Sequence, residues 1–145
     1  MKVLVTGAAG QLGTELVSVF ERGGHEVVGT THATLDISQP TAVAECVAAV
    51  KPNFIVHAAA WTAVDACESD KEKAFAVNGT ATASLVSAAE KVGARVAYVS
   101  TDYVFDGSKK SPYVETDAVN PQSVYGASKL AGEQALRDID LTVRI

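Results

Sequence analysis

The sequence predicts an α/β fold, a doubly wound parallel sheet with helices on both of its faces. Short β-branched runs alternate with longer segments of helical period, which is the pattern of successive βαβ units. A glycine-rich turn links the first β-branched run to the first helical segment. Because no internal repeat or low-complexity tract breaks this alternation, residues 1–145 are expected to form one domain.

The first strand, helix and second strand follow from periodicity and from helix-breaking residues. Residues 2–6 form a buried strand, and residues 25–29 form the second strand. The helix between them ends at Gly23 and Gly24. Its expected buried stripe consists of Leu12, Leu16, Val19 and Phe20.

The middle of the chain continues the alternation. Residues 34–37 are expected to form a short strand, and a helix opens near Thr41, just after Pro40. Residues 54–57 form the next strand. A long helix is then expected to begin at a capping box and to reach about Val92. The capping box is formed by Ser69 and Glu72.

The last third completes the pattern. Residues 95–100 form a strand, residues 106–121 a polar loop, and residues 122–137 a helix. Residues 141–145 begin another strand. Parallel strands are normally buried on both faces, and nothing in this chain follows to cover the last one. The chain is therefore expected to be the first part of a longer protein.

Composition and charge exclude several classes of protein. The 145 residues are 48% apolar, which is too much for intrinsic disorder. A net charge of −5 without a basic stretch argues against nucleic acid as a partner. The longest uncharged apolar-rich stretch, residues 54–64, is too short to span a membrane. The apolar run after Lys2 is too short for a signal peptide, so we expect a cytoplasmic protein.

Three glycines, Gly7, Gly10 and Gly13, lie between the first predicted strand and the first predicted helix. This arrangement suits a dinucleotide, because the glycines allow a sharp turn, close phosphate approach and tight packing of helix on strand. The helix N-terminus then offers free N–H groups and partial positive charge to a pyrophosphate. An ordinary strand-to-helix turn is the alternative, but the βα repetition favours a Rossmann-type NAD(P) site.

The end of the second strand bears on the choice of cofactor. NAD sites usually carry an acid there to bind the ribose hydroxyls, but this chain has Thr30, Thr31 and His32 instead. These side chains can hydrogen-bond a 2′-phosphate, so NADPH is favoured over NADH. Asp36 comes too late for the ribose and either receives the adenine amino group or caps a helix.

Tyr125 and Lys129 are four residues apart in a predicted helix, so their side chains share one face. Such a pair alone is often only a surface pair. Here Thr101 ends a predicted strand, where a doubly wound sheet binds its ligand. An ammonium beside a phenol is expected to lower its pKa, and the threonine can hold a carbonyl oxygen for protonation. The three residues are therefore a candidate proton-donating site.

Several motifs together resemble the extended short-chain dehydrogenase/reductases and, within them, the dTDP-4-dehydrorhamnose reductase family. The general motifs are Gly7-x-x-Gly10-x-x-Gly13, His57-Ala58-Ala59-Ala60, Asn78-Gly79-Thr80 and Tyr125-x-x-x-Lys129. The more specific motifs are Thr62-Ala63-Val64-Asp65, Glu68-Ser69 and Ser100-Thr101-Asp102-Tyr103-Val104-Phe105-Asp106-Gly107. The resemblance runs over all 145 residues in the same order.

The resemblance implies reduction of the C4 ketone of dTDP-4-dehydro-L-rhamnose by NAD(P)H, the last step of dTDP-L-rhamnose synthesis. It implies that Thr101, Tyr125 and Lys129 are catalytic and that Thr101 and Asp102 contact the dTDP-sugar. The glycines, Thr30, Tyr125 and Lys129 are already expected near the cofactor. The resemblance adds Gln11, Leu12, Asp36, Ile37, Ala59, Ala60 and Trp61. The sugar-nucleotide pocket of the family lies mostly in a second half that this chain lacks.

The remaining candidates have simpler alternatives. Asn78 falls on an otherwise apolar helix stripe, so it either serves the site behind Lys129 or bonds to its own backbone. Trp61 is either a cofactor neighbour or a core aromatic. His57 follows an apolar strand and is expected to be a satisfied strand-end histidine. Neither the histidines nor the two cysteines have the spacing of a metal site, so none is expected.

Two other functions remain open on the sequence alone. Another NDP-sugar reductase or epimerase would keep Tyr125 and Lys129 but use a different substrate half. A non-catalytic dinucleotide-binding regulatory subunit, such as that of methionine adenosyltransferase, would not need a proton donor. Because Thr101, Tyr125 and Lys129 are all present, the enzyme is favoured.

Overall fold

A parallel sheet forms the centre of the computed structural model, which describes residues 1–136 and the backbone of residues 142–144. Its strands are β1 (Lys2–Thr6), β2 (Glu26–Thr30), β3 (Phe54–His57), β4 (Arg95–Tyr98) and β5 (Thr142–Arg144). They lie in the order β2-β1-β3-β4-β5, and every pairing is parallel. The predicted strand over residues 141–145 is confirmed for 142–144, while residues 141 and 145 lie outside the described part.

The strand order reverses beside β1. The chain moves from β1 to β2 on one side and then crosses to β3 on the other, so the topological switch point lies between β1 and β3. In open α/β sheets ligands bind beyond the carboxyl ends of the strands at this point. The glycine turn after Thr6 and the segment after His57 both leave the sheet there.

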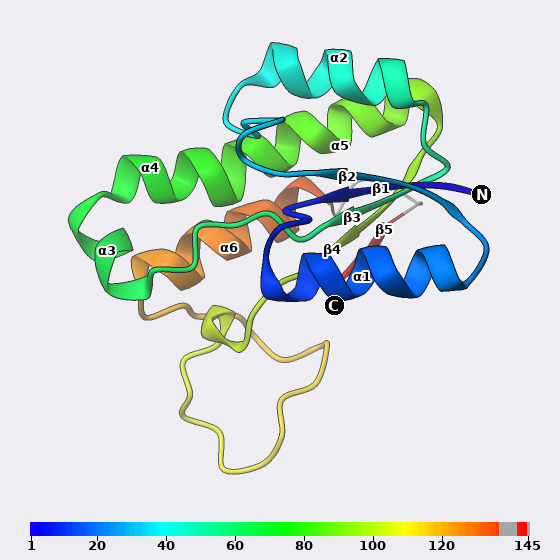
Figure 1. Cartoon of the computed structure of the whole chain (residues 1–145). Coiled ribbons are helices and arrows are strands. Elements are labelled where there is room, and N and C mark those ends of the chain that lie inside the picture. The colour runs from blue at the N-terminus through cyan, green and yellow to red at the C-terminus, as the bar shows by residue number, and fades with distance from the viewer. Residues whose placement is uncertain (137–141, 145) are drawn as a thin grey trace.

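Helices cover both faces of the sheet, as predicted (Figure 1). On one face, α1 (Gln11–Arg22) packs against Val3, Val5 and Val56. On the other face, α2 (Pro40–Val50) and α5 (Ala81–Val92) pack together over Leu4 and its neighbours. Successive residues of β1 thus face opposite cores, because side chains alternate along a strand.

The helix that follows the glycine turn is buried on a slightly different face than predicted. Leu16 and Phe20 pack against the sheet, together with Val17. Val19 is 52% exposed and Leu12 is 46% exposed, so their predicted burial is wrong. Leu12 lies in the first turn of α1.

The predicted strand over residues 34–37 is wrong; the segment is a series of turns. Its apolar side chains are nevertheless buried, with Leu35 6% and Ile37 8% exposed. The backbone bonds locally, since the N–H groups of Thr34 and Leu35 donate to Thr31 O at 3.0 and 2.8 Å. Alternating apolar residues here reflect burial under α2 rather than a strand.

The single long helix predicted over residues 69–92 is broken into parts. The chain forms α3 (Val64–Ser69), α4 (Lys71–Phe75), a π-helical turn η1 (Ala76–Thr80) and then α5. The predicted capping box is also wrong, because Asp70 is the cap: its Oδ1 accepts from Lys73 N at 3.0 Å. Aspartate at this position competes directly with serine as an N-cap.

The helix that carries Tyr125 is α6 (Val124–Ala135). It begins after Ser123, whose Oγ accepts from Gly126 N at 3.0 Å. The predicted limits were 122 and 137, and residue 137 lies outside the described part. Between β4 and α6 the chain forms a short 3-10 turn η2 (Asp102–Val104) and then the predicted loop, which extends away from the sheet (Figure 1). No helix in the described residues is long and apolar enough to cross a membrane.

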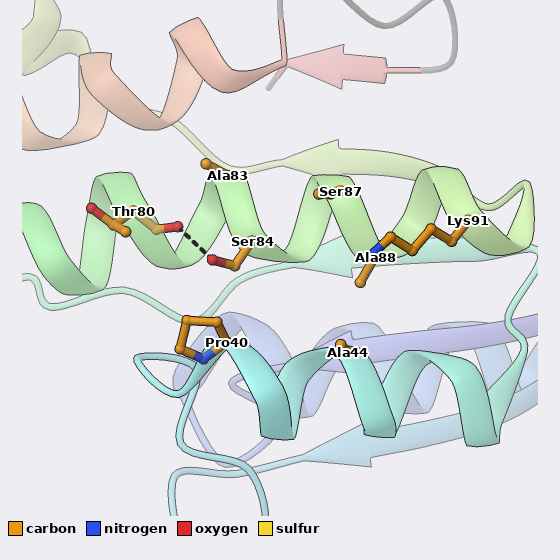
Figure 2. A pocket seen from close by; sticks show the side chains of 8 residues that line it. All are labelled: Pro40, Ala44, Thr80, Ala83, Ser84, Ser87, Ala88 and Lys91. Carbon is orange, nitrogen blue, oxygen red and sulfur yellow. Dashed lines mark hydrogen bonds between the residues drawn. The ribbon is translucent and has the colours of Figure 1, made fainter.

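A groove lies between α2 and α5, lined mostly by short side chains (Figure 2). Its lining residues are Pro40, Ala44, Thr80, Ala83, Ser84, Ser87, Ala88 and Lys91. Ser84 Oγ donates to Thr80 O at 3.1 Å, so this hydroxyl is used within its own helix. None of the predicted site residues lines this groove.

Candidate active site

The glycine turn packs against the segment after β3 so closely that side chains do not fit. Gly7 has φ +72°, and a Cβ there would lie 2.8 Å from the N and Cα atoms of Ala59. A Cβ on Gly13 would lie 2.1 Å from Gly7 O. The left-handed conformation and these approaches require glycine. The structure therefore explains two of the three roles expected of the glycines: the sharp turn and the close packing of the helix.

The N-terminus of α1 is suited to an anion. The N-cap is Gly10, whose lack of a side chain leaves the helix end uncapped, and the first turn holds no acidic residue. Thr14 N donates to Gly10 O at 3.0 Å, so the N–H groups before it precede the helical hydrogen-bond ladder. Gln11 and Leu12 are exposed. This end can therefore accept a phosphate group, as the predicted dinucleotide site requires.

The end of β2 places the residues predicted near the adenosine. Thr30 is 7% exposed, and its carbonyl accepts from Ala8 N at 2.8 Å, which ties β2 to the glycine turn. Asp36 Oδ1 accepts from Ser38 Oγ at 2.7 Å and Ser38 N at 3.0 Å. These bonds, led by the hydroxyl, lower the pKa of Asp36. Asp36 therefore caps a turn and not α2, while the Ile37 side chain faces the core.

Ala59, Ala60 and Trp61 leave the sheet beyond β3 and are half-buried. Ala59 lies against Gly7, so this segment borders the glycine turn. Trp61 packs against a cluster that contains Cys67 and Tyr125, and Lys73 Nζ lies 4.4 Å from the centre of its ring. The segment thus connects the predicted cofactor turn with the predicted catalytic helix.

Thr101 and Tyr125 meet, as the sequence predicted. The Thr101 hydroxyl lies near the Tyr125 phenol and acts to lower its pKa. Thr101 Oγ1 also donates to Asp102 Oδ1 and accepts from Tyr103 N, both at 3.2 Å. The Tyr103 ring lies edge-on to the Tyr125 ring, with centroids 5.6 Å apart. Tyr125 is 8% exposed, so its hydroxyl is held in a defined place.

Lys129 lies one turn after Tyr125 on α6 and is 3% exposed. Its Nζ donates to Val99 O at 2.6 Å and lies 4.1 Å from the centre of the Tyr98 ring. Burial lowers the pKa of Lys129 to about 8, and the Glu133 carboxylate partly opposes this shift. The ammonium is therefore close to its titration range at neutral pH.

The pKa of Tyr125 moves in the opposite direction from the one expected. The sequence suggested that the adjacent ammonium would lower it, but burial raises the pKa of Tyr125, with the Thr101 hydroxyl opposing. The physical reason is that desolvation disfavours the phenolate and that Lys129 Nζ is held by Val99 O. Tyr125 is accordingly a protonated phenol at neutral pH, the form that can donate a proton.

Asn78 connects the two sides of this region. It is 1% exposed, its Oδ1 accepts from Trp61 N at 2.8 Å, and its Nδ2 donates to Trp61 O and Ser128 Oγ, each at 3.0 Å. Trp61 is 17 residues away in the sequence, so the alternative of purely local backbone bonding is wrong. Ser128 Oγ in turn donates to Tyr125 O at 2.7 Å. Asn78 therefore holds α6 against the segment after β3.

Three further residues place the site; two of them, Ser100 and Glu68, stood in the family motifs without a role, and Glu133 was not predicted. Ser100 Oγ donates to Glu133 Oε1, which ties the residue before Thr101 to α6. Glu68 Oε1 accepts from Val124 N at 2.7 Å and so holds the first residue of α6. Glu133 lies four residues after Lys129, so helical spacing alone could have identified it. Glu68 stands in the motif Glu68-Ser69, but no local pattern indicates its partner, which is 56 residues away.

His57 and the two cysteines have the surroundings of structural side chains, as expected. His57 is 1% exposed, and Thr6 and Thr82 satisfy both of its ring nitrogens. Cys46 and Cys67 are free thiols, and burial raises the pKa of each. Within the described part of the chain, no group of three or more histidine, cysteine or carboxylate side chains could hold a metal ion.

The doubly wound sheet, the glycine turn at its switch point and the Thr101, Tyr125 and Lys129 set define a Rossmann-type domain of the extended short-chain dehydrogenase/reductase class. More particularly, the chain belongs to the RmlD substrate binding domain family, whose model matches residues 1–145.

Known relatives agree with this assignment. A dTDP-4-dehydrorhamnose reductase from Burkholderia thailandensis is 49% identical over 138 residues, 95% of this chain and 46% of that protein. A crystal structure of a dTDP-4-dehydrorhamnose reductase from Clostridium acetobutylicum is 43% identical, with a TM-score of 0.94 over 99% of this chain and 52% of that one. One from Bacillus anthracis in complex with NADP is 34% identical, with a TM-score of 0.95 over 99% and 51%. The chain thus spans about half the length of these relatives.

Proposed function

We propose that this chain is the cofactor-binding and catalytic half of a dTDP-4-dehydrorhamnose reductase. The observation that carries the proposal is the placement of the Thr101 hydroxyl beside a buried, protonated Tyr125 phenol beyond the end of β4. This pair can hold and protonate a ketone oxygen. The relatives named above supply the substrate class, a dTDP-linked 4-keto sugar.

The chain's own residues fit a nicotinamide dinucleotide. Gly7, Gly10 and Gly13 form a turn that leads to an uncapped helix end, where the N–H groups of Gln11 and Leu12 are free to receive the pyrophosphate. The other residues that would border the cofactor are Thr30, Asp36, Ile37, Ala59, Ala60, Trp61, Tyr125 and Lys129. The relative from Bacillus anthracis was crystallised with NADP, and the hydroxyls after β2 suit its 2′-phosphate, so we propose NADPH as the preferred form.

Each catalytic side chain then has one task. A bound nicotinamide would supply the hydride for the ketone carbon, and Tyr125 would donate its proton to the ketone oxygen. Thr101 orients that oxygen, and Asp102 beside it contacts the sugar nucleotide. Lys129, which is protonated below a pH of about 8, would hydrogen-bond the nicotinamide ribose. Most of the sugar pocket would lie in the half of the protein that the relatives have beyond this chain.

The test is single-turnover oxidation of NADPH, then NADH, by the intact protein with dTDP-4-dehydro-L-rhamnose. Tyr125→Phe should abolish turnover and leave nicotinamide binding nearly unchanged, because it removes one hydroxyl. Tyr103→Phe is the matched control: its ring touches Tyr125, but its side chain is 47% exposed, and we expect near-normal turnover. Loss of binding and turnover together in Tyr125→Phe would contradict the proton-donor role.

The same assay separates the competing functions. A different NDP-sugar reductase or epimerase would bind NADPH or NADH but leave this substrate unreacted. A regulatory subunit would bind the dinucleotide and turn over no sugar nucleotide at all.

A further inference from the structure

His57 is the last residue of β3, and the predicted function gives it no task. Its imidazole is 1% exposed and lies between two threonines: Nδ1 is 2.7 Å from Thr6 Oγ1, and Nε2 is 3.2 Å from Thr82 Oγ1. Burial, with Lys129 as a further cause, lowers the pKa of His57 to about 3, so the ring is neutral at neutral pH. A neutral ring carries one proton, so one nitrogen donates and the other accepts.

The neighbouring bonds decide which nitrogen carries the proton. Thr82 Oγ1 donates to Asn78 O at 2.8 Å, which uses its only proton. Thr82 must therefore accept from His57, so Nε2 carries the hydrogen. Nδ1 is then the acceptor, and Thr6 Oγ1 donates to it. Thr6 Oγ1 itself accepts from Ala59 N at 3.4 Å, and every donor in this chain of bonds points from Ala59 toward Asn78.

One end of this chain is the cofactor turn. Thr6 immediately precedes Gly7, and Gly7 packs against the backbone of Ala59. Because Thr6 bonds to both Ala59 N and His57 Nδ1, it fixes the ends of β1 and β3 at the switch point. Those two ends border the place where the pyrophosphate would lie.

The other end is the catalytic helix. Asn78 O lies in the π-helical turn η1, where it also accepts from Tyr98 Oη at 3.3 Å. The Asn78 side chain holds Ser128 on α6, and Ser128 lies next to Lys129. The position of Asn78 O, set in part by Thr82, thus affects the helix that carries Tyr125 and Lys129.

We propose that His57, as the neutral Nε2–H tautomer, is a positioning residue with two separable actions: Nδ1 secures the cofactor turn, and Nε2–H secures the catalytic helix. The inference rests on the proposed function, since that function makes the turn and the helix the binding and catalytic elements. The two nitrogens face different parts of the site. Loss of the bond at Nδ1 should therefore weaken cofactor binding, and loss of the bond at Nε2 should lower kcat.

Two substitutions separate the actions. In His57→Asn the side-chain oxygen replaces Nδ1 and keeps the bond from Thr6, but nothing replaces Nε2–H. In His57→Gln the terminal amide replaces Nε2–H and keeps the bond to Thr82, but nothing replaces Nδ1. We expect His57→Asn to bind NADPH as the wild type does and to lose about tenfold in kcat, and His57→Gln to show the reverse, about tenfold weaker NADPH binding with kcat nearly kept.

The measurements are NADPH binding by fluorescence titration, kcat in the intact protein, urea unfolding of both variants and 15N NMR of the histidine rings. We expect the His57 Nδ1 resonance to be that of an unprotonated nitrogen from pH 8 to pH 5. Equal losses of binding and kcat in both variants, in step with their stability, would show a purely structural role and overturn the proposal. A protonated Nδ1 would also overturn it. If the wild type does not bind NADPH, the proposed function is wrong, and so is the positioning role of His57. The NMR data still decide which ring nitrogen carries the proton.

Discussion

Lowering the pH from 7 to 5 should destabilise this protein through His57. The folded protein holds the pKa of His57 at about 3 because the ring is buried, whereas the unfolded chain has the ordinary value of 6.5. Below pH of about 6.5 the unfolded state therefore binds a proton that the folded state excludes. Stability from the neutral ring is complete above that pH and is lost as the pH falls toward 3.

The size of the effect follows from these two values. Each pH unit between them reduces the free energy of unfolding by up to ~1.4 kcal/mol. At pH 5 the loss is ~2 kcal/mol, and at pH 3 it is ~4 kcal/mol. No correction for solvent screening applies, because the side chain is 1% exposed. The groups that face the ring are the Tyr98 ring, at 5.6 Å between centroids, and the Lys129 ammonium, and neither gains a proton in this range.

The assay compares urea unfolding of the intact wild type and of His57→Gln at pH 7 and pH 5. Glutamine does not titrate, so the variant should lose ~2 kcal/mol less than the wild type between the two pH values. Carboxylates elsewhere titrate in both proteins, and their effect cancels in the difference. Equal losses in the two proteins would refute the reasoning, because His57 would then bind its proton equally in the folded and unfolded states.

Three further predictions concern other parts of the chain. Gly13→Ala places a Cβ 2.1 Å from a backbone oxygen and should lower the free energy of unfolding by ~3 kcal/mol. Gly24→Ala is the control: Gly24 has φ +75° but open space around it, so the free energy of unfolding should fall by only ~1 kcal/mol. Thermal or urea unfolding measures both losses, and equal losses would contradict the clash at Gly13. In the cofactor-free protein, NMR titration should show Lys129 losing its proton as the pH rises through about 8, and a midpoint at the ordinary 10.5 contradicts the effect of burial. Asp106→Ala removes the acceptor that organises the loop after η2, so trypsin should cut after Lys109 faster than in the wild type; an unchanged rate would show that other contacts hold the loop.

The sheet could be predicted from the sequence because parallel strands are buried on both faces and so appear as short continuous apolar runs. Residues 34–37 show the limit of that argument. Leu35 and Ile37 are buried in alternation, but they pack under α2 from a series of turns. Burial alone gives the same pattern as a strand, and only the hydrogen bonds to Thr31 O distinguish the two.

In the candidate site, Thr101, Tyr125 and Lys129 could be predicted because a motif and a helical spacing bring them together. The protonation of Tyr125 could not, because its pKa depends on how deeply α6 is buried. The partners of Asn78 could not either. Trp61 and Ser128 are 17 and 50 residues away, and no local pattern indicates that one amide binds both.

The π-helical turn Ala76–Thr80 has a consequence for changes in chain length. It holds one residue more than a regular helical turn, so the buried faces of α4 and α5 are offset from those of one uninterrupted helix. Deleting one residue inside this turn would restore a regular helical turn and keep the faces of α4 and α5 as they are, whereas deleting one residue from α4 or α5 themselves would rotate the residues on either side of the gap by ~100°. Leu85 would then turn out of the core, or Ala74 would turn away from Tyr125. The turn can therefore lose one residue, whereas α4 and α5 cannot.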